Sequence, residues 1–148
     1  MARKPWALAG LFVLLAAIVS GGQARDHDPT WRAPSREAER ANPLVGRGDV
    51  VAGGRKLFQQ RCASCHGDDG LGTARAPNLA DRQVQVQSDG ALHWKISHGN
   101  ARTDMPSFSF LPESQRWQLV LHLRSLTDLS RESQNARRFA MKHHSERT

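Results

Sequence analysis

The sequence predicts a small all-α domain with about three to four helices and long loops. Three observations indicate this fold class. Apolar residues recur at helical spacing in several stretches, and no run alternates polar and apolar residues as a strand does. Gly, Asp, Ser, Thr and Pro collect between the helical stretches, which is typical of loops. At 148 residues the chain allows one domain with extensions at its ends.

Residues 1–24 have the pattern of a secretory signal peptide. Two basic residues precede an apolar run from Ala7 to Val19, and small residues lead to Ala24, after which we expect cleavage. The run is shorter than the about 20 apolar residues that a membrane span needs. Retention as a membrane anchor stays open, because two glycines extend the run. The protein is therefore predicted to be exported, with membrane attachment only if this segment is retained.

Residues 25–48 are predicted to be a polar extension. They carry mixed charges, three prolines and few apolar residues, which is typical of a tether or of an arm that wraps a domain. Trp31, Leu44 and Val45 are the only obvious anchors in this segment. We do not expect the extension to fold on its own.

The first helix of the domain is predicted to run from about Val50 into a cysteine motif. Its positions i, i+3, i+4 and i+8 are occupied by Gly54, Leu57, Phe58 and Cys62. Residues at this spacing lie on one face of a helix, so this face is expected to pack against the rest of the domain.

Two more helices are predicted downstream. A middle helix covers residues 91–97 and ends at Gly99. The last helix begins at Pro112, which suits a first helical turn, and Glu113 complements the positive end of the helix dipole. Its broad apolar face contains Trp117, Leu119, Val120, Leu121, Leu123 and Leu126. The segments 67–76 and 99–111 are expected to be loops.

Residues 128–148 form a polar, basic tail. We expect this tail to fray, with Phe139 and Met141 docking weakly at most. The domain is therefore predicted to occupy residues 49–127.

Both cysteines of the chain lie in the sequence Cys62-Ala63-Ser64-Cys65-His66. The pattern C-x-x-C-H is typical of c-type haem attachment, in which each thiol adds across a haem vinyl group and the histidine becomes an axial ligand of the iron. A C-x-x-C pair can also form a dithiol redox centre or half of a zinc site. No second pair completes a zinc site here, and no strands alternate with helices as in thioredoxin-like proteins.

Met105 is the predicted second axial ligand. It is the only methionine of residues 49–127, and Pro106 stiffens the backbone beside it. Histidine–methionine ligation raises the reduction potential and favours electron transfer over oxygen chemistry. The alternative of two histidine ligands stays open, because the chain also contains His93, His98, His122, His143 and His144.

A covalent haem would also explain how so small a domain folds. A domain of about 80 residues has a marginal apolar core. Long loops without secondary structure are uncommon unless they enclose something. One haem c in the middle of the domain would provide apolar surface for the helices and a partner for the loops.

The charge distribution argues against a nucleic-acid partner. The formal net charge is +7, but two of these charges lie in the signal segment. Residues 49–127 contain nine basic and seven acidic side chains, and two haem propionates would bring this part close to neutral. The remaining excess is divided between the two polar extensions. This is a mixed, solvated surface rather than a basic stripe with interleaved aromatic residues.

The chain resembles the class I c-type cytochromes, the single-haem bacterial kind, over about residues 49–127. The resemblance is carried by Gly54, Leu57 and Phe58, by Cys62 to Gly67, by Gly70 and Gly72, by Pro77-Asn78-Leu79, by Trp94, Ile96 and Gly99, by Met105-Pro106, and by the stretch from Trp117 to Leu126. The resemblance implies a cytochrome c fold wrapped around one haem. The tyrosine that is common in the family at the position of His122 is missing, and the chain contains no tyrosine.

The resemblance also implies roles for several residues. The carbonyl of Pro77 would accept a hydrogen bond from His66, and Leu79 would pack on the haem. Trp94 or Arg102 would contact a propionate in place of tyrosine, although Trp94 fits equally well as packing at the haem edge. Gly54 and Phe58 would let the first helix cross the last one closely.

The implied function is that of a periplasmic electron carrier or electron-transfer subunit, and not of an enzyme. Its partners would be redox proteins, namely a dehydrogenase, an oxidase or another cytochrome. An alternative is a haem with a displaceable distal ligand that acts in gas sensing or peroxide chemistry, which would require that Met105 does not bind iron. The charged extensions could also hold the cytochrome to a larger complex, which is compatible with electron transfer.

Overall fold

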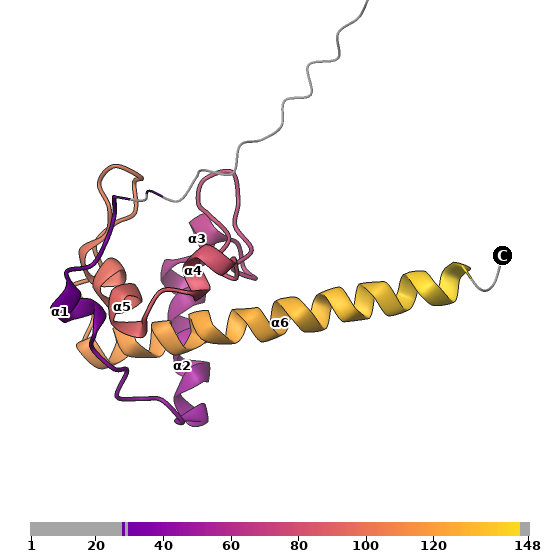
Figure 1. Ribbon diagram of the computed structural model, residues 1–148, viewed down its shortest axis with the longest axis horizontal. Coiled ribbons are helices and arrows are strands. Elements are labelled where there is room, and N and C mark those ends of the chain that lie inside the picture. The colour runs from indigo at the N-terminus through magenta and orange to yellow at the C-terminus, as the bar shows by residue number, and fades with distance from the viewer. Residues whose placement is uncertain (1–27, 29, 146–148) are drawn as a thin grey trace, which may run out of the picture.

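The computed structural model describes residues 28 and 30–145, and the expected signal segment lies outside them. Within these residues the secondary structure is helical, which confirms the predicted all-α class (Figure 1). The helices are α1 (Ser35–Ala38), α2 (Gly48–Arg61), α3 (Ala63–His66), α4 (Arg82–Gln85), α5 (Asp89–His98) and α6 (Glu113–Ser145). No helix in this part of the chain is long and apolar enough to cross a membrane.

The crossing of α2 over α6 forms the centre of the domain (Figure 1). Gly54 makes the close approach possible, because a Cβ at this position would lie 2.1 Å from the backbone oxygen of Gln118. One turn later, Phe58 is fully buried, and its ring lies 5.0 Å from the ring of His122. The predicted close crossing is confirmed, and histidine occupies the position where tyrosine is common.

Helix α5 is two residues longer at its start than predicted. The side chain of Ser88 caps this end by accepting a hydrogen bond from the backbone N–H of Ala91. At the other end, Gly99 has a φ of +65° and stops the helix. Leu92 and Ile96 point into the core beside the buried face of α6.

Helix α6 does not end near Leu126, and the prediction that the tail frays is wrong. The helix continues without a break to Ser145 and projects away from the domain (Figure 1). The extension contains no Gly or Pro. Because it continues a helix that the core already stabilises, it needs no new nucleus. Phe139 and Met141 do not dock on the domain core, since they are 66% and 73% exposed.

The segment from Trp31 to Arg47, hereafter the arm, packs along the domain, and α1 lies against α5. A Cβ at Gly90 would lie 2.1 Å from the backbone oxygen of Glu37, so glycine is needed where the two helices meet. Leu44 packs against the core as expected. Val45 is 69% exposed, and its predicted role as an anchor is wrong.

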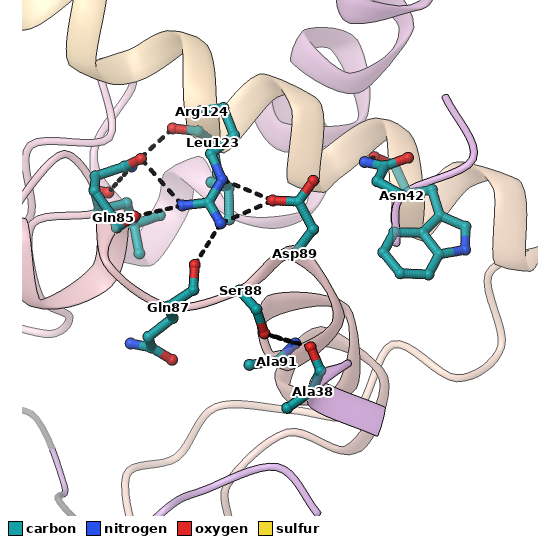
Figure 2. A network of polar contacts seen from close by, with 11 residues as sticks. Ala38, Asn42, Gln85, Gln87, Ser88, Asp89, Ala91, Leu123 and Arg124 are labelled. Carbon is teal, nitrogen blue, oxygen red and sulfur yellow. Dashed lines mark hydrogen bonds and ion pairs between the residues drawn. The ribbon is translucent and has the colours of Figure 1, made fainter. Parts of the chain in front are cut away.

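The anchor that the sequence did not reveal is Asn42. Its buried side-chain amide donates to the backbone oxygen of Trp117 at 3.2 Å. A second tie comes from Ser88, whose hydroxyl donates to the backbone oxygen of Ala38 at 2.6 Å (Figure 2). The arm is therefore held by polar contacts with the backbone as well as by the packing of Leu44.

Candidate functional site

The C-x-x-C-H motif forms a tight turn at the end of α2. Cys62 ends α2 and begins α3, and its backbone oxygen accepts hydrogen bonds from the N–H groups of Cys65 (3.1 Å) and His66 (2.9 Å). Two cysteines three positions apart in such a turn lie on the same side of the chain. Both thiols are free and partly buried, and burial raises the pKa of Cys62 to about 12.

The imidazole of His66 is oriented by Pro77. Its Nδ1 lies 3.0 Å from the backbone oxygen of Pro77. A carbonyl oxygen can only accept, so Nδ1 carries the proton and Nε2 keeps its lone pair free for a metal. Burial lowers the pKa of His66, which favours the neutral imidazole that metals bind. The contact expected between His66 and Pro77 is present.

The loop after the motif folds back beneath it. The backbone N–H of Gly72 donates to the oxygen of His66 at 2.9 Å, and the hydroxyl of Thr73 donates to the oxygen of Cys65 at 2.5 Å. Gly72 has a φ of +87°, and a Cβ there would lie 2.7 Å from the backbone nitrogen of Asn78. These contacts bring Pro77 back to the histidine ring. Thr73 was not singled out in the sequence.

Leu79 is fixed by a polar network that reaches α6, and Figure 2 shows the part of it formed by Gln85, Asp89 and Arg124. The side-chain amide of Gln85 donates to the backbone oxygens of Leu79 (2.7 Å) and Leu123 (2.9 Å). Arg124 in turn donates to the backbone oxygen of Gln85 and to the carboxylate of Asp89, each at 2.8 Å. Sequence reasoning missed Gln85 and this role of Arg124, since neither residue follows an apolar period.

Met105 lies in the loop between α5 and α6, and Asn100 holds its backbone. The N–H of Asn100 donates to the oxygen of Met105 at 2.8 Å, and the reverse hydrogen bond measures 3.2 Å. Gly99 permits this close fold, because a Cβ there would lie 2.5 Å from the oxygen of Met105. The importance of Asn100 was not predicted, because a reciprocal backbone pair has no sequence signature.

Cys62, Leu79 and Met105 lie at the rim of the apolar core. All three are partly buried and pack against the same apolar core, although the chain positions them from three different segments. Apolar and sulfur-containing groups that stay incompletely covered at the rim of a core suit a flat apolar ligand. With two thiols and a histidine whose Nε2 is free, this donor set fits a covalent haem.

Trp94 of α5 is not part of the core that contains Leu92 and Ile96. Its ring stacks on His98, with centroids 4.6 Å apart. Together with His93, Arg40 and Arg116 it lines a cavity of about 470 Å³ between the arm, α5 and the start of α6. The guanidinium of Arg102 donates to the hydroxyl of Thr30 at 3.3 Å. A contact of Trp94 or Arg102 with haem stays a prediction.

The histidines of α5 and α6 have packing partners of their own. His93 is buried, stacks on Trp117 at 4.0 Å and accepts from Arg116 at 3.5 Å. Burial and the positive charge of Arg116 lower its pKa to about 4. His122 is buried against Phe58. Within the described part of the chain, no three His, Cys, Asp or Glu side chains are grouped to hold a metal ion.

Comparisons with known proteins point to one group of respiratory proteins. Residues 49–123, half of the chain, match the family described as cytochrome c oxidase, cbb3-type, subunit III. One similar protein is the cbb3-type cytochrome c oxidase subunit FixP of Bradyrhizobium diazoefficiens, with 43% identity over 58 residues. The aligned part is 37% of this chain and 20% of that relative, so the chain spans about a fifth of the relative's length.

Proposed function

The chain belongs to the cytochrome c oxidase, cbb3-type, subunit III family, and on this premise we propose that it passes single electrons through one covalent haem c with His66 and Met105 as axial ligands. The c-type cytochrome domain makes it a haem-binding electron-transport protein. Its redox partners would belong to an exported respiratory chain. An oxidase complex is the first candidate, because the similar protein FixP is a subunit of such an oxidase.

Each residue of the site would have a defined task. The thiols of Cys62 and Cys65 would each add across one vinyl group, with sulfur bonding to one carbon and the proton going to the other. His66 would offer the lone pair of Nε2 while Pro77 holds its Nδ1–H. When bound, the haem supplies an iron that alternates between the ferrous and ferric states.

The position of Met105 is the observation that carries this proposal. Its side chain packs against the same core as Cys62 and Leu79, and its backbone is fixed by Asn100. If the thioether of Met105 binds the iron opposite His66, it would leave no open position there and would keep substrates and gases away. A closed haem in an apolar pocket is suited to outer-sphere electron transfer.

Replacement of Met105 tests the ligation directly. Met105→Ala in the holoprotein should abolish the weak far-red absorption band of methionine-ligated ferric haem, lower the reduction potential and allow carbon monoxide to bind. Met141→Ala is the matched control, because this methionine is 73% exposed on the projecting part of α6. A wild-type protein without the band, or a Met105→Ala variant that keeps it, would contradict the proposal. Carbon monoxide binding to the wild type would support gas or peroxide chemistry instead.

One mass measurement tests the number of haems and the location. The mature protein from the membrane and soluble fractions should carry the mass of a single haem. We propose that it is exported to the periplasm, and cleavage after Ala24 would give a soluble form. An intact N-terminus found only in the membrane fraction would instead support an anchor. Two haem masses, or none, would contradict the proposed cofactor.

A further inference from the structure

Trp31 of the arm and Lys95 of α5 form a cation–π pair in which the buried indole N–H of Trp31 lacks an acceptor. Lys95 is 6% exposed, and its Nζ lies 4.6 Å from the centroid of the Trp31 ring. The Nε1 of Trp31 is buried and has no hydrogen-bond partner. Among the ion pairs of the described residues, none involves Lys95. Buried donors of this kind are rarely left unsatisfied in a working protein.

The pair lies at the base of the loop that carries Met105. Lys95 is one helical turn before Gly99, which touches the backbone of Met105. Just before the arm, two residues close to Trp31 in sequence are bound to the same loop. Asp28 accepts from the side-chain amide of Asn100 at 3.3 Å, and Thr30 accepts from Arg102 at 3.3 Å. The unsatisfied Nε1 of Trp31 and the ammonium group of Lys95 therefore lie at the base of the loop that carries Met105.

The carboxylate closest in sequence to this pair has other partners. Asp28 accepts hydrogen bonds from the backbone N–H and the hydroxyl of Thr30, which lower its pKa to about 2. Burial lowers the pKa of Lys95, and the charged groups that act on it are Asp28, just before the arm, and Arg32 within the arm. The pair thus offers an indole N–H and an ammonium group to an anion that the arm does not supply.

We infer that Trp31 Nε1 and Lys95 Nζ bind a propionate of the haem. A carboxylate matches one neutral and one charged donor, and the haem brings two such groups. This inference rests on the haem c of the proposed function. It is an alternative to the contact expected for Trp94 or Arg102, which stays a prediction. Trp31 lies before the family match at residues 49–123, so the arm adds a haem-binding residue to the family domain.

The pH profile of the reduction potential in the holoprotein tests the inference. A propionate favours ferric iron once it ionises, so the potential falls with rising pH as the proton leaves. Loss of a cation nearby raises the pKa of a carboxyl group by about one unit or more. Lys95→Met should therefore move this phase of the profile upward by about one pH unit, a tenfold gain in proton affinity. Trp31→Phe should shift it in the same direction by less.

Two further measurements complete the test. Lys56→Met, which removes an exposed lysine of α2, is the matched control and should leave the profile unchanged. In the wild-type holoprotein, the indole N–H of Trp31 should exchange slowly with solvent, and Lys95→Met should speed this exchange. This NMR readout needs no electron transfer. If Lys95→Met does not fold, Trp31→Phe replaces it in the pH profile, and the exchange rate of the wild-type indole remains the NMR test.

The possible failures are distinguishable. An unchanged profile in Lys95→Met and Trp31→Phe, or rapid exchange of the Trp31 indole in the wild type, overturns the propionate site and leaves the proposed function intact. A wild-type protein without haem contradicts the proposed function, and the propionate site falls with it.

Discussion

Alanine substitutions at two adjacent glycines of α2 should have opposite effects on stability. A Cβ at Gly54 would lie 2.1 Å from the backbone oxygen of Gln118 and 3.1 Å from Cβ of His122. At Gly53, the nearest atom would be Oε1 of the Gln118 side chain, at 2.7 Å. A backbone oxygen inside a packed helix cannot move away, whereas the end of a glutamine side chain can rotate.

The size of the effect follows from the separation that Gly54→Ala imposes. Ordinary contact begins at 3.4 Å, so α2 and α6 must move apart by roughly 1 Å. A gap of this size forfeits about a quarter to a half of the dispersion energy across the interface. For the fully buried Phe58 and its neighbours this amounts to about 2–4 kcal/mol. The better helix propensity of alanine stabilises the variant by about 1 kcal/mol, so the free energy of unfolding should fall by about 1–3 kcal/mol in total.

Urea denaturation of the holoproteins, followed by circular dichroism, measures this difference. Gly53→Ala should be neutral or more stable than the wild type by up to about 1 kcal/mol, because it gains the helix propensity without the collision. Gly54→Ala should have a lower midpoint with the same slope. Equal midpoints for the two variants would refute the argument that the close crossing of α2 and α6 depends on Gly54.

Two other predictions concern the methionine loop and the acid sensitivity of the fold. Asn100→Asp places a second carboxylate next to that of Asp28, and the repulsion should weaken the far-red methionine band. Adding Asp28→Asn should restore the band, because the amide and the carboxylate then only exchange positions. A double variant no better than Asn100→Asp would show that this contact does not position the loop. The folded-state pKa of His93 is about 4, below its unfolded value of 6.5, so the unfolded chain binds more protons between these values. Stability should thus be complete above pH 6.5 and fall as the pH is lowered towards 4. His93→Phe should flatten this fall, and an unchanged pH slope would exclude His93 as its source.

The helices of the domain could be predicted because their signals are local. Gly54 and Phe58 recur at helical spacing, and Gly99 and Pro112 mark an end and a start. The length of α6 could not be predicted in the same way. The polar composition after Leu126 resembles a solvated tail, and only the preceding, already stabilised helix makes its continuation favourable.

The candidate site was predicted where chemistry requires particular residues in sequence. The C-x-x-C-H motif belongs to this class, whereas the Pro77 partner of His66 was implied by the family resemblance. The contacts of Gln85 with Leu79 and of Asn100 with Met105 join residues by backbone oxygens, which every residue has. Such contacts leave no pattern in a single sequence.

The docking of the arm determines how far the domain could travel if residues 1–24 remained in a membrane. A free extension of residues 25–48 would reach about 80 Å when fully stretched. With Asp28 already bound to the domain, only residues 25–27 lie between, and they span at most about 10 Å. The haem domain would then be confined close to the membrane surface. A tether this short would raise the effective concentration of the domain at a neighbouring membrane complex, because the domain would sample a much smaller volume than it would on a free extension.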